Sequence, residues 1–285
     1  MRGPLDRRTF TAGLAAATLL PRCAGAAPPP RFIGCIDFDA IRRHLRAPSP
    51  QPAPSFVPGN AAQAADLAAL RREEEELAQT ERGVALRRYL WDKGTQLSVS
   101  FLNGTPRQRQ RVTAYAPVWS IYSGVKLTFL PAPGGDIRIS FDAGALSYSA
   151  IGMEATTLPV AQPTMTLAQM TDDLSDAQAR GLVLHEFGHA LGLVHEHQSP
   201  AAGVPWNRAA AYAYFGRAPF YLSPTEVDQQ ILTTYDETVT NHTQFDPLSI
   251  MVYPIPAAIT DGKYHVDMNL DLSPTDKSFI ASQYG

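Results

Sequence analysis

The sequence contains little cysteine, no excess of positive charge and no long apolar run. Only two cysteines occur among 285 residues, so removal of Cys23 with a leader would leave Cys35 alone and exclude an intramolecular disulfide. The formal net charge is -3 and the pI is near 6.2, which gives no electrostatic reason to expect nucleic acid or an anionic membrane surface as a partner. No apolar stretch approaches the ~20 residues of a membrane-spanning helix. The hydrophobic content of 45% is enough for a full core, or for two lobes around a cleft.

Residues 1–26 have the layout of a signal peptide. A charged head with paired arginines precedes a mild apolar run over residues 12–20 and a group of small residues. The arginine pair followed by Thr-Phe resembles the twin-arginine type, and the alternatives are an ordinary secretory signal or a frayed cytosolic terminus. Arginine directly before Cys23 argues against a lipoprotein site. We therefore predict an exported protein, periplasmic or secreted.

Residues 27–90 are predicted to be a Pro/Ala-rich linker or pro-region followed by a charged helix. Prolines interrupt residues 27–60, and alanine, leucine, glutamate and arginine dominate the rest. The charge run at residues 71–76 is interpreted as a solvated helix face. The main domain is then predicted over residues 91–285.

The most informative stretch of that domain lies between His185 and Glu196. Two histidines four residues apart, His185 and His189, lie on one face of a helix and can bind one metal ion as neighbours, with Glu186 beside it. Gly192 is a position where the helix can break, so that His195 becomes a third ligand. Three nitrogen ligands with a fourth position open are typical of a catalytic zinc site.

These residues carry a resemblance to a known family. The arrangement H-E-x-x-H-x-x-G-x-x-H is the metzincin protease motif. Residues 245–253, F-D-P-L-S-I-M-V-Y, resemble the methionine turn that astacins write as Y-D-x-x-S-I-M-x-Y. Glu196 after the third histidine and Tyr253 two places past Met251 are similar to astacins, whereas matrixins usually have serine and no tyrosine there. The chain thus resembles a bacterial astacin-like zinc metallopeptidase.

The chain also departs from the astacin pattern. Phe245 replaces the first tyrosine of the methionine turn, Val252 stands where histidine is common, and Gly188 is shared with matrixins. Animal astacins carry disulfides in the catalytic domain, which two cysteines at positions 23 and 35 do not provide.

The resemblance implies an α+β, two-lobed fold with a twisted mixed sheet and the zinc helix in the N-terminal lobe, and an irregular C-terminal lobe with the methionine turn. It implies one catalytic Zn²⁺ on the three histidines and a protein or peptide substrate. Zinc lowers the pKa of a bound water to about 7, Glu186 acts as general base, and Tyr253 donates a hydrogen bond to the oxyanion. Glu196 would receive the matured N-terminus, and His197 would form hydrogen bonds behind the ligands.

Two other functions compete with peptide hydrolysis. The first is a zinc-retaining binding or adhesin module that cleaves nothing, against which the intact Glu186 argues. The second is a hydrolase of the same fold that acts on a non-peptide bond, for which no residue argues. The sequence indicates neither the cleavage preference nor the oligomeric state.

A further hypothesis concerns Cys35. The stretch F-I-G-C-I at residues 32–36 resembles the F-x-G-D-I of astacin pro-segments, in which the aspartate caps the zinc. A thiolate is a good zinc ligand, so Cys35 is a candidate latency switch, and an idle or buried cysteine is the alternative.

The pattern also predicts the elements around the motif. Strands are expected at residues 97–102, 125–130, 136–141 and 163–167, with a loop at 144–152 and residues 164–167 at the cleft edge, where an extended peptide can pair. Helices are expected from Thr105 to about 122 with a kink at Pro117, and at 173–193, 206–214, 224–232 and 273–284.

Overall fold

The structure is a computed structural model that describes residues 89–142, 146–218, 220–235 and 245–285. The predicted leader, the pro-region up to residue 88 and Cys35 lie outside the described residues. Among the described residues, no helix is both long and apolar enough to cross a membrane.

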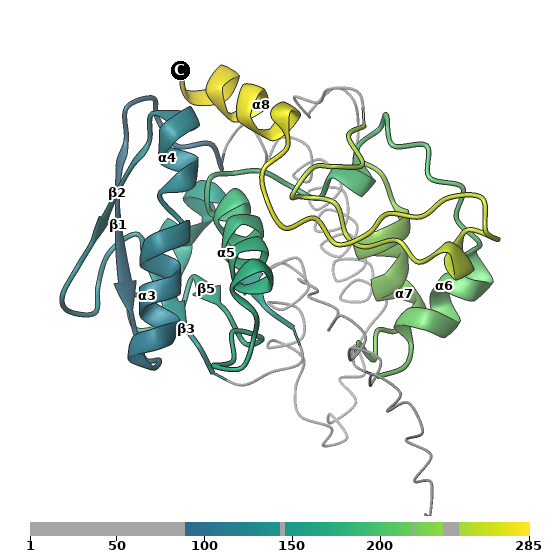
Figure 1. The fold of residues 1–285 in the computed structure, drawn as a ribbon, viewed down its shortest axis with the longest axis horizontal. Helices are drawn as coiled ribbons and strands as arrows, with labels where there is room; N and C mark the ends of the chain where they lie inside the picture. The colour runs from purple at the N-terminus through teal and green to yellow at the C-terminus, as the bar shows by residue number, and fades with distance from the viewer. Residues whose placement is uncertain (1–88, 143–145, 219, 236–244) are drawn as a thin grey trace, which may run out of the picture. The chain divides into compact units, whose positions relative to one another are not determined.

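A five-stranded mixed sheet forms the framework of the N-terminal part (Figure 1). Its strand order is β2-β1-β3-β5-β4. The first four strands in this order run parallel, and β4 pairs antiparallel with β5, with Tyr148 opposite Thr166 and Ser149 opposite Met165. The strands are β1 (Gln96–Phe101), β2 (Lys126–Phe129), β3 (Ile137–Ser140), β4 (Tyr148–Ser149) and β5 (Met165–Thr166).

The order of strands corrects the predicted cleft edge. Residues 164–167 do not form the edge, because β5 lies between β3 and β4. The edge strand is β4, within the stretch that was expected to be a loop. A two-residue strand is too short for alternating polarity to reveal it, and its place is defined by pairing with β5.

Two helices follow β1, where one helix from Thr105 to about residue 122 with a kink at Pro117 was predicted. Thr105 caps α3 (Pro106–Tyr115) through a capping box with Gln108. Pro117 ends this helical stretch, and α4 (Val118–Ser123) follows it. The buried Trp119 of α4 donates its indole N–H to the carbonyl of Leu184 at 2.9 Å, which ties α4 to the helix that carries the histidines.

That helix is α5 (Asp176–Ala190), with Ser175 as its N-cap. It packs into a core cluster formed with the sheet, α3, α4 and the C-terminal helix α8 (Pro274–Tyr284). In Figure 1, α5 lies to the right of β1 and β2 and below α8.

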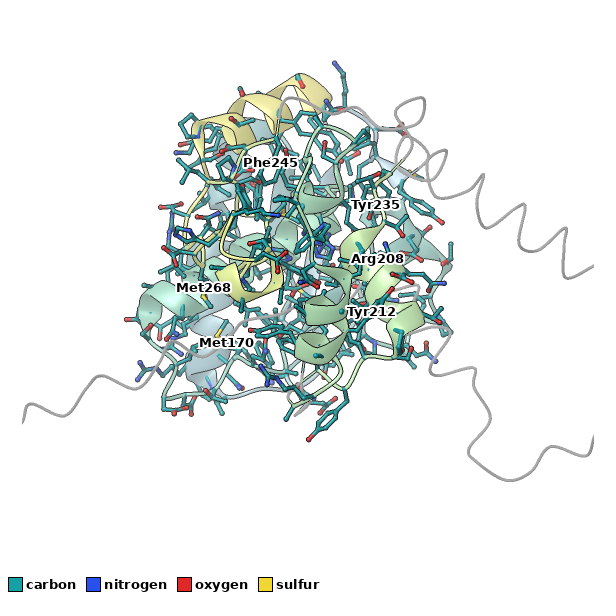
Figure 2. All side chains as sticks on the ribbon, turned by 90° about the vertical axis from the view of Figure 1, so that its right-hand side faces the viewer. Met170, Arg208, Tyr212, Tyr235, Phe245 and Met268 are labelled. Atoms are coloured by element: carbon teal, nitrogen blue, oxygen red, sulfur yellow. The ribbon has the colours of Figure 1, made fainter. Side chains whose placement is uncertain are left out.

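A second hydrophobic cluster belongs to the less regular C-terminal part. It contains side chains of α6 (Arg208–Phe215), α7 (Pro224–Val227) and the π-helical η3 (Asp228–Leu232), with residues of the 252–266 segment. Arg208 and Tyr212 lie together on this part in Figure 2, and both donate hydrogen bonds to Asp228. Short 3₁₀ turns complete the chain: η1 (Gly152–Thr157), η2 (Glu196–Gln198) and η4 (Ala257–Ile259).

The fold is therefore α+β, as predicted. Its two clusters meet at one turn, since Ile250 and Met251 belong to the first and Val252 and Tyr253 to the second. This turn faces the histidines of α5.

Candidate metal centre

The helix α5 brings His185 and His189 together as their spacing predicts. Their ring centroids are 4.9 Å apart, and the helix around them is held by buried apolar side chains such as Leu184 and Phe187. The rigid helix thereby places both imidazoles before any metal binds.

The end of α5 brings in the third histidine. Gly192 has a φ of +89°, its N–H donates to the carbonyl of His189 at 2.7 Å, and the N–H of Leu193 donates to that of Gly188 at 3.0 Å. These bonds form a Schellman motif, which reverses the chain just past the helix. The prediction that Gly192 breaks the helix is confirmed, and His195 follows directly.

The three histidines meet at one point. Each offers a ring nitrogen, and these atoms all lie within 4.8 Å of one another. Nε2 of His189 and Nε2 of His195 are only 3.1 Å apart. Nδ1 of His185 lies 2.7 Å from the carbonyl oxygen of Ile250, and Nδ1 of His189 lies 2.9 Å from that of Leu193. These carbonyls favour the tautomer with the proton on Nδ1, which leaves each Nε2 as a donor to a metal.

Burial keeps these rings neutral. Desolvation lowers the pKa of His185 to about 4 and that of His189 to about 3, and it lowers the pKa of His195 well below its usual range. The neighbouring imidazoles lower the last two pKa values further. Neutral imidazoles retain the lone pairs that a metal ion needs.

The donor set fits zinc. Nε2 of His185 is buried and has no hydrogen-bond partner among the described residues, which is costly unless a ligand uses it. Three neutral imidazole nitrogens with room for a further ligand are the donors of a catalytic zinc ion. Among the described residues, these three histidines form the group that could hold a metal ion.

The turn at residues 249–252 supports the centre from the C-terminal part. Asp276 of α8 accepts hydrogen bonds from Oγ of Ser249 at 2.6 Å and from the N–H of Ile250 at 2.8 Å. The carbonyl of the same Ile250 faces Nδ1 of His185. The peptide groups flanking Ile250 thus connect a buried carboxylate to a metal-site ring. Sequence reasoning missed Asp276, although the pattern Ser-x-x-Asp at 273–276 marks it as a helix-capping residue.

Met251 lies against α5 from the same turn. It is 2% exposed, and a Cβ built on Gly188 would come within 2.4 Å of its Sδ. The absence of a side chain at Gly188 therefore makes room for the methionine. The sequence motifs include both Gly188 and Met251, but they do not predict that the two residues are in contact.

Tyr253 lies among the imidazoles. Its ring centroid is 4.3 Å from that of His195 and 6.1 Å from that of His185. On its other face the Tyr253 ring stacks on the ring of His197, with the two centroids 4.7 Å apart. Nε2 of His197 lies 3.3 Å from the carbonyl oxygen of Gln230. His197 is outside the three-ligand group and packs against Tyr253.

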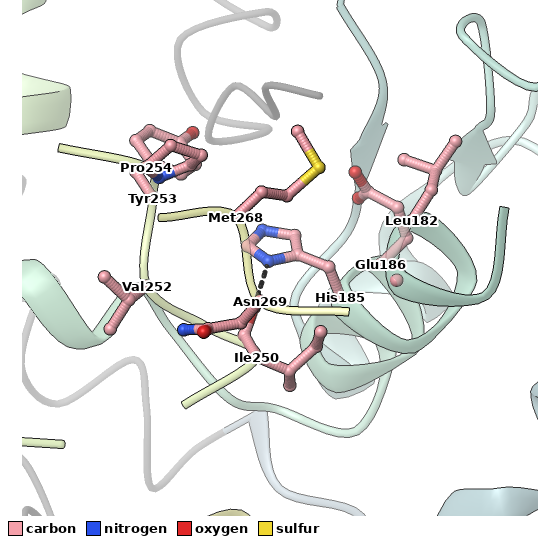
Figure 3. Close-up of a pocket in the computed structure, with 10 residues that line it drawn as sticks. Leu182, His185, Glu186, Ile250, Val252, Tyr253, Pro254, Met268 and Asn269 are labelled. Atoms are coloured by element: carbon pink, nitrogen blue, oxygen red, sulfur yellow. Dashed lines mark hydrogen bonds between the residues drawn. The ribbon is translucent and has the colours of Figure 1, made fainter. Parts of the chain in front are cut away.

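Two carboxylates adjoin the histidines. Glu186 is fully buried and lines a pocket together with His185 and Tyr253 (Figure 3). Glu196 accepts the N–H of Asp246 at 3.3 Å, and burial raises its pKa to about 7. The centre therefore combines three imidazole nitrogens, a buried carboxylate and a phenol, a set of groups that suits metal-assisted hydrolysis.

Comparison with known proteins agrees with this class of site. No family model matches the chain, and a search of curated proteins found no match. Among solved structures, one of myroilysin, a bacterial astacin-family metalloprotease, is 39% identical with a TM-score of 0.68, over 70% of this chain and 97% of that one. A second structure of myroilysin matches with a TM-score of 0.55 and 39% identity, over 69% and 86% of the two chains. High choriolytic enzyme 1, a hatching enzyme zinc-protease from Oryzias latipes, matches more weakly, at 16% identity with a TM-score of 0.49, over 68% of this chain and 92% of that one.

The chain belongs to the astacin-like family of metzincin zinc metalloproteases. It is a zinc-dependent endopeptidase with one zinc ion, as the sequence predicted.

Proposed function

We propose that His185, His189 and His195 hold the zinc ion, that Glu186 is the general base and that Tyr253 donates a hydrogen bond to the oxyanion. One observation carries the proposal: the three convergent imidazole nitrogens lie beside a pocket that Glu186 and Tyr253 also line.

The side chains have distinct tasks. When bound, zinc supplies Lewis-acid chemistry, acidifying water and polarising a carbonyl. The carboxylate of Glu186 accepts the proton that the attacking water loses and delivers it to the leaving amine. Its burial excludes bulk water, which strengthens its interactions with the reacting groups. The phenol of Tyr253 is a neutral donor, suited to the negative charge that develops on the carbonyl oxygen.

Stacking against His195 and His197 holds the Tyr253 ring at the centre. Because His197 is itself fixed near the Gln230 carbonyl, the tyrosine is supported from the C-terminal part. We expect Tyr253→Phe to keep zinc and to lose less activity than a change at Glu186.

Cleavage of unfolded casein by the purified chain tests the proposal directly. We expect cleavage that stops when a zinc chelator is added and returns when zinc is restored. Glu186→Gln is the matched control, because it keeps the size of the side chain and removes the base. Chelator-insensitive cleavage would contradict the metal assignment. Zinc binding without cleavage of any protein, including after removal of the pro-region, would favour a binding module.

We also propose that residues 1–26 are an export leader and that residues 27–90 form a linker or pro-region ahead of the catalytic domain. The layout of the leader supports export to the periplasm or the medium. N-terminal sequencing of the exported protein before and after maturation would locate the two cleavage sites. Cys35→Ser should raise the activity of the full chain if the thiolate caps the zinc, and equal rates would contradict that hypothesis.

A further inference from the structure

A pocket beside the candidate catalytic groups is lined almost entirely by uncharged side chains. Apart from His185, Glu186 and Tyr253, its walls are made by Gly181 and Asn269 and by apolar residues. These apolar residues are Leu182, Ile250, Val252, Pro254 and Met268. Among the described residues, no lysine or arginine lines it, so an acidic side chain entering this pocket would find no cationic side chain to pair with.

Most of the wall is rigid. Leu182, Ile250 and Val252 are at most 3% exposed and belong to the two hydrophobic clusters. The backbone of residues 269–270 crosses α5 so closely that a Cβ on Gly181 would lie 3.1 Å from Cα of Leu270. The backbone segment that carries Met268 is thereby held against α5.

The polar group of the wall is already engaged. The side-chain amide of Asn269 donates to the carbonyls of Pro247 at 2.9 Å and Ser249 at 2.8 Å. Its N–H groups are therefore not available to a substrate carboxylate. What remains for recognition is apolar surface.

Met268 differs from the rest of the wall. Its side chain is half-buried, has three rotatable bonds and points between Glu186 and Pro254 in Figure 3. With Met268 in this position the free volume is about 20 Å³, on the order of one water molecule. A larger substrate side chain therefore requires a lining side chain to move, and Met268 is the long flexible one among them.

We propose that Met268 determines specificity: the pocket accepts the apolar side chain of a residue flanking the scissile bond, and Met268 adjusts to its size. This inference rests on the proposed function. An acidic side chain is disfavoured twice, since burying a carboxylate without a partner is costly and Glu186 faces the same space. An apolar side chain gains contact with Met268 and the fixed walls.

The test is a mass-spectrometric map of cleavage sites in a peptide library, made with the zinc-loaded full chain and three variants. For the unchanged protein, one position flanking the cut should be enriched in Leu, Met, Ile or Phe and depleted in Asp and Glu, with a difference in kcat/KM on the order of 100-fold. Met268→Ala should increase the relative cleavage of Phe and Trp at that position by about 10-fold. Met268→Lys should increase that of Asp and Glu by about 10-fold.

Asp267→Asn is the control, because it changes the net charge by the same +1 as Met268→Lys at an exposed neighbour that does not line the pocket. Its cleavage profile should match that of the unchanged protein. An unchanged cleavage profile in both Met268 variants would overturn the role of Met268. A preference of the unchanged protein for acidic residues would overturn the apolar specificity of the pocket. Both outcomes would leave the proposed peptidase function in place. Absence of cleavage by the unchanged protein, both as the full chain and after removal of residues 1–90, would overturn the proposed function, and this inference with it.

Discussion

Replacing Gly188 by alanine tests the contact between α5 and the turn beneath the metal centre. A Cβ at this position would lie 2.4 Å from Sδ of Met251 and 3.3 Å from Cζ2 of Trp119. Met251 is 2% exposed and Trp119 is 0% exposed, so neither side chain has solvent to move into. The added methyl group must therefore displace the methionine within a packed core.

The expected change in the free energy of unfolding of Gly188→Ala follows from two opposing effects. Alanine in place of a helical glycine stabilises by about 1 kcal/mol, whereas overpacking a core costs about 1–3 kcal/mol. Gly188→Ala should therefore lower the free energy of unfolding by up to about 2 kcal/mol instead of raising it. Met251→Ala leaves a cavity and should cost about 2–5 kcal/mol.

The double variant measures the contact itself. With Met251 truncated, the new methyl group has room, and the helix propensity of alanine is gained without a clash. The double variant should then be more stable than the sum of the single changes predicts, by about 1–3 kcal/mol. Met251 belongs to the same turn as Ile250, whose carbonyl oxygen faces Nδ1 of His185, so its displacement should also lower the activity of Gly188→Ala.

Urea unfolding of the zinc-loaded proteins provides the free energies, and peptide hydrolysis provides the activities. Ala213→Gly, on an exposed position of α6, is the control. It should cost about 1 kcal/mol and so calibrate the propensity effect in this protein. A Gly188→Ala protein that is stabilised by that full amount, in an additive cycle, would refute the packing argument.

Three other predictions concern the groups around the centre. Glu186→Gln should retain zinc by elemental analysis and lower kcat/KM by about 10²- to 10⁴-fold, and an active variant would show that another group takes the proton. Asp276→Asn, which weakens the carboxylate bonds to Ser249 and Ile250, should weaken zinc binding about 10- to 100-fold in chelator competition; unchanged affinity would show that Ile250 does not position His185. Burial raises the pKa of Tyr284 to about 12, so between pH 10 and 12 the unfolded chain loses a proton that the folded chain keeps. The free energy of unfolding should therefore fall over that range by up to about 3 kcal/mol more in the unchanged protein than in Tyr284→Phe, and equal slopes in urea unfolding would contradict the assignment.

Much of the metal centre could be predicted because its determinants are local. Histidines four apart share a helix face, and a glycine three residues later permits a positive φ, so the order of ligands follows from spacing alone. The caps at Thr105 and Ser273 and the break at Pro117 are local in the same sense. The geometry of these caps and of this break depends on residues within one or two helical turns, so the local sequence is enough to predict it.

Contacts between distant segments were not accessible in this way. The edge position of β4 depends on a partner strand, and the pairing of Gly188 with Met251 joins residues 63 positions apart in the numbering. The bonds from Asp276 to Ile250, and the hydrogen bond from the Tyr284 hydroxyl to the Leu191 carbonyl at 2.7 Å, likewise join the C-terminal helix to the centre. None of these contacts produces a local motif or a hydrophobic periodicity in the sequence from which it could be predicted.

The sequence by itself predicted the class of chemistry, because it places three imidazoles, a carboxylate and a phenol in the order of an astacin-like metalloprotease. The tertiary structure decided which surfaces meet around that chemistry, including the pocket under Met268 and the wall that Gly181 brings close. The reason is physical, because ligand spacing is set by helix geometry, whereas the shape of a pocket is set by side chains that only packing brings together.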